Sequence, residues 1–131
     1  MTIELPIYWV KTFKTKPNKT VLAGMNWYRN AHHFDQNKMK KDYHELVHKQ
    51  LTDTKINGTF KLRIEIYYKN SSCDGANIAA LMEKVTLDAL QEENVIVNDN
   101  VQYHLGSSWE ILGQDKTNPR CIITIITTEN S

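Results

Sequence analysis

The sequence predicts an α+β fold with one mixed sheet of about four or five strands packed with two main helices. Residues 59–68 alternate apolar and polar side chains, as a half-buried strand does. Apolar residues recur at helical spacing in two segments, from Met39 to Leu51 and from Ile78 to Ala89. Residues 121–127 are rich in Ile and Thr, which favour a final strand.

Length and composition predict a single domain, residues 1–131, because 131 residues with 40% hydrophobic content suffice for one core and not for two. No apolar run approaches the roughly 18 residues of a membrane span. The N-terminal residues lack the basic start and long apolar region of a signal peptide, and Cys73 and Cys121 are too few for a disulfide framework. We therefore expect a cytoplasmic protein with no membrane contact.

The N-terminal elements begin with Ile3 to Val10, which is apolar enough for a first strand. The lysine-rich residues 11–19 predict a strand end and a turn, with Pro17 and Asn18 as the breakers. Residues 25–33 mix aromatic, amide and basic groups without a clear period. That mixture suits a nucleic-acid contact, and it suits a well-packed loop equally well.

Two predicted helices and the remaining strands follow. Asp35 is a plausible cap for the first helix, and Asn57-Gly58 predicts a turn before the alternating strand. The second helix opens at Asp74. After it, three short β-prone segments predict strands, at residues 95–97, 101–105 and 109–111.

Charge is divided unequally along the chain. Residues 1–50 hold nine Lys and Arg against four Asp and Glu, whereas residues 51–131 hold seven against eleven. A basic half suits a polyanion and an acidic half suits divalent cations, although a charged segment is usually only a solvated face.

The region with the most polar chemistry is the second helix and its flanks. On a helical wheel Asn77, Lys84 and Asp88 lie within about 20° of one line, and the helix is bracketed by Asp74 and Asn98-Asp99. Acids, a lysine and an amide around one helix indicate a metal site acting on phosphate. The alternative interpretation is that Asp74 only caps the helix and that Lys84 and Asp88 form an ordinary ion pair.

A second motif competes with this site. His44-Glu45-Leu46-Val47-His48 matches H-E-x-x-H, in which two histidines one helical turn apart bind zinc and the glutamate is a general base. A catalytic zinc needs a third protein ligand, which His104 or Asp74 would have to supply. His44 and His48 also lie about 100° and about 140° from the centre of the apolar face, on the solvent side.

The ordered set of motifs resembles the RusA-type Holliday-junction resolvases, especially phage versions. It comprises residues 25–33, the alternating strand, Asp74-Gly75-Ala76-Asn77, Glu83-Lys84, Asp88-Ala89-Leu90 and residues 95–100. The resemblance implies a homodimeric, magnesium-dependent endodeoxyribonuclease of DNA recombination and repair. Such an enzyme binds four-way junctions and nicks two strands symmetrically, in the host cytoplasm if it is phage-encoded.

The family pattern transfers unevenly. Its helix opening, Asp-x-Asp-Asn, matches at Asp74 and Asn77, but Ala76 replaces the middle acid. About four extra residues precede Lys84, which keeps its face of the helix and shifts by about 6 Å along the axis. Asp99 matches the second of the family's paired aspartates, with Asn98 in place of the first.

The resemblance assigns roles to these residues. Asp74 and Asp99 would bind Mg²⁺, for which Mn²⁺ could substitute, and Asp88 or Glu83 would be the third acid, with Asp88 preferred. Lys84 would contact the scissile phosphate. The predicted DNA-binding residues are Lys11, Lys14, Lys16, Lys19, Asn26, Arg29, Asn77 and Lys84.

Two alternatives remain beside the resolvase. One is a non-cleaving DNA-binding module that lost activity with the acid at position 76, and the other is the zinc hydrolase on His44 and His48. For the resolvase we expect a homodimer, because two symmetric nicks need two sites. Its interface would use an apolar sheet or helix edge, with both acidic sites facing a basic surface built from both copies of residues 11–33.

Overall fold

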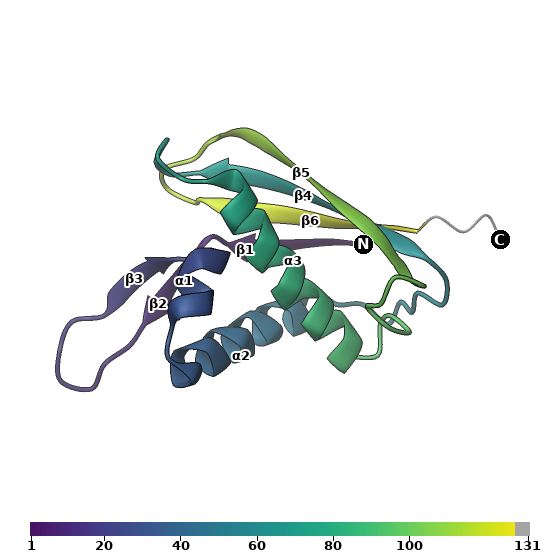
Figure 1. Ribbon diagram of the computed structural model, residues 1–131, viewed down its shortest axis with the longest axis horizontal. Coiled ribbons are helices and arrows are strands. Elements are labelled where there is room, and N and C mark those ends of the chain that lie inside the picture. The colour runs from purple at the N-terminus through teal and green to yellow at the C-terminus, as the bar shows by residue number, and fades with distance from the viewer. Residues whose placement is uncertain (128–131) are drawn as a thin grey trace.

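The computed structural model describes residues 1–127 as six strands and three helices (Figure 1). In chain order they are β1 Thr2–Pro6, β2 Tyr8–Lys11, β3 Lys19–Leu22, α1 Met25–Asn30, α2 His33–Gln50, β4 Phe60–Tyr68, α3 Gly75–Glu92, β5 His104–Gln114 and β6 Arg120–Thr127.

The main sheet is four-stranded and mixed, with the order β1-β6-β4-β5. β4 pairs with β5 in parallel and with β6 antiparallel, and β1 completes the sheet antiparallel to β6. A parallel pair needs a long crossover, and α3 is that crossover between β4 and β5. β2 and β3 form a separate antiparallel hairpin. The predicted α+β fold, with one mixed sheet and two main helices, is confirmed.

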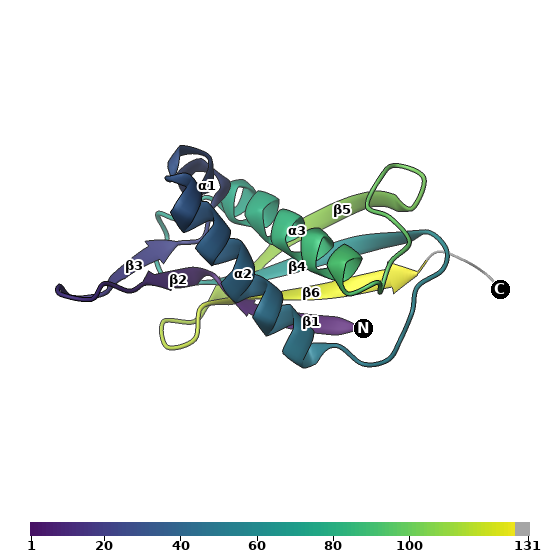
Figure 2. The same ribbon diagram turned by 90° about the horizontal axis from the view of Figure 1, so that it is seen from below.

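The helices cover one face of the main sheet, and the other face is open (Figure 2). β4 shows the division: Phe60, Leu62, Ile64 and Ile66 are buried toward the helices. Lys61 and Arg63 on the opposite face are exposed. The period-2 pattern of the sequence therefore marks the two faces of the sheet as predicted.

α3 is the central helix of the fold. Its first residues are capped by Asp74, whose Oδ1 accepts hydrogen bonds from the backbone N–H groups of Ala76 and Asn77 at 3.0 and 3.3 Å. Its wide apolar stripe includes the fully buried Ile78, Leu81 and Met82. α3 contacts β4 and β5 of the main sheet as well as α1 and α2, so it joins the other helices to the sheet.

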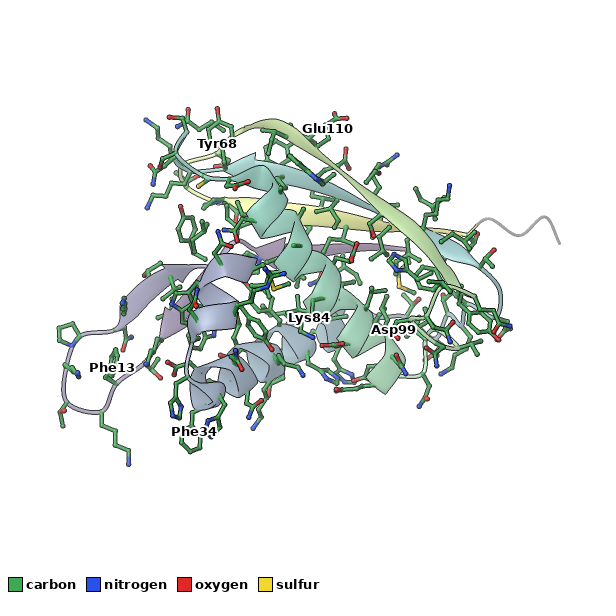
Figure 3. The ribbon with its side chains drawn as sticks, in the orientation of Figure 1. Phe13, Phe34, Tyr68, Lys84, Asp99 and Glu110 are labelled. Carbon is green, nitrogen blue, oxygen red and sulfur yellow. The ribbon has the colours of Figure 1, made fainter. Side chains whose placement is uncertain are left out.

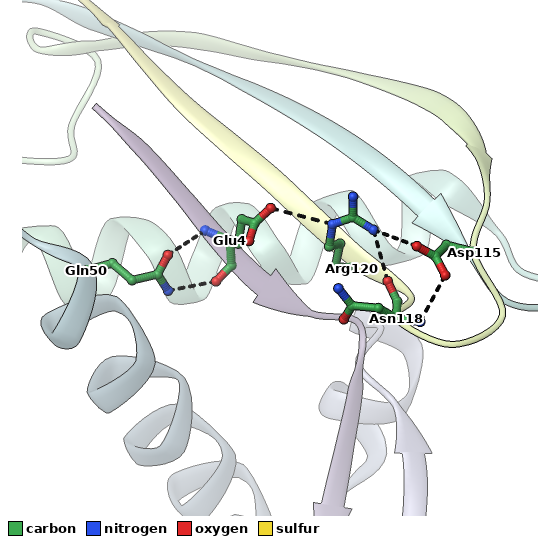
Figure 4. A network of polar contacts seen from close by, with 5 residues as sticks. All are labelled: Glu4, Gln50, Asp115, Asn118 and Arg120. Atoms are coloured by element: carbon green, nitrogen blue, oxygen red, sulfur yellow. Dashed lines mark hydrogen bonds and ion pairs between the residues drawn. The ribbon is translucent and has the colours of Figure 1, made fainter.

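The two edges of the main sheet differ. At the β1 edge the side-chain amide of Gln50 accepts a hydrogen bond from Glu4 N and donates one to Glu4 O, each 2.7 Å long. The Glu4 carboxylate lies 3.5 Å from the Arg120 guanidinium, which also pairs with Asp115 at 2.9 Å (Figure 4). The Gln50 side chain therefore satisfies the Glu4 N–H and C=O groups with which an added strand would pair. β5 pairs with β4 on its inner side, and no other strand of residues 1–127 pairs with it; at its start His104 N donates to Asn100 O of the preceding turn at 2.9 Å. β5 is therefore the open edge.

Several expected boundaries near the N-terminus are wrong. The predicted strand Ile3–Val10 is two strands, because the chain leaves the main sheet after Pro6, and Ile7 O accepts from Ala23 N in the hairpin sheet at 2.7 Å. The aperiodic residues 25–33 contain α1, a helix too short to display a period. α2 is capped by His32, whose Nδ1 accepts from Phe34 N, rather than by Asp35.

The segments after α3 also differ from expectation. Residues 95–97 form no strand and contribute only an isolated bridge between Ile56 and Ile96. The expected strands at residues 101–105 and 109–111 are one strand, β5, which starts at His104 after a turn. No helix in residues 1–127 is long and apolar enough to cross a membrane.

Candidate nucleic-acid interface and predicted metal ligands

The β2–β3 hairpin projects from the body of the molecule at the end where α1 and α2 begin (Figure 1). β2 and β3 pair from Tyr8 opposite Leu22 to Lys11 opposite Lys19, so the connecting loop is residues 12–18. The projection explains why this lysine-rich segment has no apolar period: most of its side chains have no core to face.

The hairpin is fixed at its base by buried and charged contacts. Trp9 is 6% exposed, donates from Nε1 to Asp42 Oδ2 at 2.8 Å, and packs against the Trp27 ring at 5.5 Å. Lys11 Nζ lies 2.7 Å from Asp35 Oδ2 at the start of α2. Two carboxylates of α2 therefore hold the hairpin in a defined position.

The lysines of the hairpin fall into two kinds. Lys11 is paired with Asp35, whereas Lys14, Lys16 and Lys19 are exposed and form no ion pair with any acid in residues 1–127. Lys16 Nζ instead lies 4.8 Å from the centre of the Phe13 ring. Three uncompensated positive charges on a fixed projection attract a polyanion.

α1 adds to this surface. Arg29 is exposed on α1, and no ion pair to it occurs in the described part of the chain. The backbone N–H of Asn26 donates to Asn77 Oδ1 at 2.7 Å, an internal bond that ties α1 to α3. A Cβ on Gly24 would lie 2.1 Å from Asn77 Nδ2, so this close approach requires glycine.

The predicted metal ligands do not meet within one chain. Asp74 caps the start of α3 and Asp88 lies fourteen residues later, which is about 21 Å along the axis. Asp99 lies beyond the opposite end of α3 from Asp74 (Figure 3). Among residues 1–127, no three His, Cys, Asp or Glu side chains are arranged to hold a metal ion. A magnesium ion therefore does not fit the predicted three-aspartate set within one copy.

Asp88 and Lys84 are paired with one another. Lys84 Nζ lies 3.4 Å from Asp88 Oδ2, and Lys40 Nζ of α2 lies 3.8 Å from the same oxygen. Lys40 and Asp88 border a cavity of about 400 Å³ between α2 and α3. Two ammonium groups around one carboxylate more than neutralise its charge, and the pairing of Lys84 with Asp88 matches the ion-pair interpretation of this motif.

Glu83, the other candidate for the third acid, lies on a different side of α3. It borders a shallow pocket with Ala76 and Ala80, facing Ser107 and Trp109 of β5. Glu83 therefore lies toward the open sheet edge, whereas Asp88 lies toward α2. The structure thus places the preferred Asp88 and the alternative Glu83 on different sides of α3.

The H-E-x-x-H histidines contact glutamates at the end of α3. His44 Nδ1 lies 2.6 Å from Glu92 Oε2 and His44 Nε2 lies 2.7 Å from Glu93 Oε1, while His48 Nδ1 lies 2.8 Å from the same Glu93 oxygen. Both ring nitrogens of His44 are thus engaged by carboxylates. This pairing joins α2 to α3.

The ionisation of this cluster follows from its contacts. The hydrogen bond from His44 lowers the pKa of Glu93, and the hydrogen bond to Glu93 raises the pKa of His44 against the smaller opposing effect of burial. Each charged form stabilises the other. The cluster therefore acts as an ion pair between helices across the mildly acidic range.

Sequence reasoning missed the contacts that anchor the hairpin. The Trp9–Asp42 bond and the Lys11–Asp35 pair join residues 33 and 24 positions apart, and no local pattern indicates them. The available signal is the spacing of Asp35 and Asp42, two turns apart on one face of α2.

Comparisons of this chain with models of known protein families and with curated protein sequences found no match.

Proposed function

We propose that this chain is a cytoplasmic DNA-binding protein that binds branched DNA through the β2–β3 hairpin and α1. The observation that supports binding most directly is the group of exposed basic side chains without an acidic partner in residues 1–127: Lys14, Lys16, Lys19 and Arg29. The preference for four-way junctions is supported by the ordered resemblance to RusA-type resolvases.

The position of the lysines favours a nucleic acid over a small anion. Lys14 and Lys16 lie in the loop of the projecting hairpin and Lys19 begins β3, so the charges follow one another along the chain and suit successive phosphates of a backbone. The anchors at Trp9 and Lys11 keep the loop fixed before DNA arrives, which lowers the entropy lost on binding.

The proposal is tested by fluorescence anisotropy with a labelled four-way junction and a duplex of the same sequences, in buffer without divalent cations. We expect tighter binding to the junction and a steep loss of affinity as salt increases. Equal affinity for junction and duplex would contradict the preference for branched DNA. Absence of salt-dependent binding to either would contradict the DNA-binding function.

Magnesium-dependent junction cutting is the second candidate function, and it requires two copies of the chain. Gly75 at the start of α3 lies against Trp109 and Ile111 of β5, whereas Asp99 precedes β5. Cutting by Asp74 and Asp99 would require a dimer, for example one paired through the β5 edges about a two-fold axis, that places Asp74 of one copy near Asp99 of the other. Half-exposed apolar side chains line this edge, namely Leu105, Trp109, Ile111 and Leu112.

Mixing two inactive variants tests this second candidate. Asp74→Asn and Asp99→Asn should each fail to nick a four-way junction in Mg²⁺. If each site takes one aspartate from each copy, the mixed dimer contains one intact site, and co-refolded variants should nick one strand. Full activity of either variant alone would contradict the assignment, and a strict monomer by light scattering would contradict the dimer. If the unmutated chain binds the junction and does not nick it, DNA binding remains as the only supported function.

A further inference from the structure

Three rings gather at the start of α2, outside the hydrophobic core. The ring centres of His32 and His33 are 4.3 Å apart, those of His33 and Phe34 are 4.4 Å apart, and His32 and Phe34 stack at 5.0 Å with 22° between their planes. All three side chains are exposed, and that of Phe34 is 70% exposed. A large apolar ring in this setting does not contribute to the core.

The ring cluster, defined as His32, His33 and Phe34, is held in place by its own backbone. His32 is the N-cap of α2 and its Nδ1 accepts from Phe34 N at 3.2 Å. Phe34 belongs to the first turn of an 18-residue helix. The exposed phenyl ring is therefore presented from a rigid element, so little conformational entropy is lost when a partner contacts it.

The ring cluster and the hairpin lie at the same end of the molecule (Figure 3). Asp35, the residue after Phe34, pairs with Lys11 at 2.7 Å, and Lys11 Nζ lies 5.1 Å from the centre of the Phe13 ring. These contacts connect the start of α2, which carries Phe34, to the hairpin, where Lys16 Nζ lies 4.8 Å from the centre of the same Phe13 ring. An exposed flat ring at the same end of the molecule as uncompensated lysines combines the two features that bind single-stranded nucleic acid.

We infer that the ring cluster is a stacking site for an unpaired base of the nucleic acid bound by the hairpin. The inference rests on the proposed DNA-binding function and adds to it the kind of DNA structure that is recognised. In a duplex the base faces are covered by their neighbours, so a ring can stack only on a base that is unpaired. The charges decide between occupants: the hairpin at the same end of the molecule carries the exposed Lys14, Lys16 and Lys19, which favour a polyanion over an apolar protein surface.

The test uses three labelled DNA probes: a single-stranded oligonucleotide, a four-way junction with 2-aminopurine at the branch point, and a fully paired duplex. Phe34→Ala should weaken single-strand binding at least about 10-fold more than duplex binding. Phe34→Tyr, which keeps a flat ring, should retain the preference, and Phe34→Leu should lose it. Val101→Ala is the matched control, because Val101 is an 89% exposed apolar residue outside this surface.

An unpaired base can come from the branch point of a junction or from a single strand, and the two give separate readouts. 2-Aminopurine fluorescence reports whether the base is stacked on its neighbours, so a fluorescence change on the junction that is lost in Phe34→Ala assigns the site to an unpaired base at the branch point. A preference seen only with the oligonucleotide assigns it to single strands. Equal weakening of all three probes by Phe34→Ala, or no weakening of any, would overturn the inference while leaving DNA binding by the lysines in place. Absence of DNA binding by the unmutated chain would overturn the proposed function as well.

Discussion

The hairpin and the α2–α3 interface use charged residues in opposite ways. At the α2–α3 interface His44 and His48 contact Glu92 and Glu93, and Lys40 and Lys84 flank Asp88. On the hairpin three lysines have no acidic partner within residues 1–127. Charges that are already paired stabilise helix packing, and charges that are unpaired can bind a ligand. The paired charges join α2 to α3, and the unpaired charges are the reason we propose the hairpin as the DNA-binding surface.

The largest expected effect is on the hairpin. The variant K14A/K16A/K19A should lose on the order of 100-fold in junction affinity at low salt, and the slope of log K against log salt should fall by about three. The measurement is anisotropy across a salt series. The variant K49A/K61A/K116A removes the same charge from exposed lysines elsewhere and should bind nearly as well as the unmutated chain. Equal losses in both variants would mean that only net charge matters.

The next largest effect is expected on stability, at the contact between Gly24 before α1 and Asn77 of α3. Gly24→Ala places a Cβ against Asn77 and should lower the free energy of unfolding by about 1–3 kcal/mol. Denaturant unfolding measures the loss. Adding Asn77→Ala removes the obstructing side chain. The double variant should therefore lose less free energy of unfolding than the sum of the losses in the two single variants. Additive losses would show that Gly24 does not contact Asn77.

Two substitutions of Asp74, which caps α3, distinguish the hydrogen bonds of its side chain from its negative charge. Asp74→Ala should cost about 1 kcal/mol of stability because two backbone N–H groups lose their acceptor, whereas Asp74→Asn should keep the cap. Thermal or denaturant unfolding checks both. If Asp74→Asn is as unstable as Asp74→Ala, the carboxylate charge rather than the hydrogen bonds stabilises the helix start.

The smallest expected effect is pH-dependent and concerns the His44–Glu93 pair. Because the pKa of Glu93 is lowered, its contribution is present above the ordinary glutamate pKa and is lost as pH falls through the lowered value. Because the pKa of His44 is raised, its contribution is present below the ordinary histidine pKa and is lost as pH rises through the raised value. The pair therefore stabilises the fold most between about pH 4.3 and about pH 6.5.

Glu93→Gln should accordingly lower the melting temperature more at about pH 5.5 than at about pH 9. Glu110→Gln, which removes an exposed carboxylate from β5, should show no such difference between the two pH values. A Glu93→Gln effect that is the same at both pH values would contradict an ion pair and leave only a neutral hydrogen bond.

Local patterns predicted the parts of the fold that local burial determines. β4 and α3 were predicted because each alternates or repeats its apolar residues on one buried face. α1 was missed because six residues cannot display a helical period. The break between β1 and β2 was missed although Pro6, which has no N–H to give to a strand, marks it. The apolar residues on both sides of Pro6 continue the strand pattern, and the chain turns to pair with β3.

The candidate site was less predictable, because it depends on which charges find partners. The lysines of the hairpin look alike in sequence, yet Lys11 is neutralised by Asp35 and the other three are not. Asp74, Asp88 and Asp99 are near in sequence, but a straight helix separates the first two. A helical wheel gives the direction of a side chain and not its distance along the axis, so it grouped residues that lie far apart.

The most direct test of the account is a titration of the ¹⁵N-labelled chain with an unlabelled four-way junction, followed by NMR. We predict the largest changes at the amides of residues 12–22 and of α1, and small changes at His44, Lys84 and Glu93. Large changes at the α2–α3 interface with an unperturbed hairpin would contradict the claim that unpaired charges mark the DNA-binding surface.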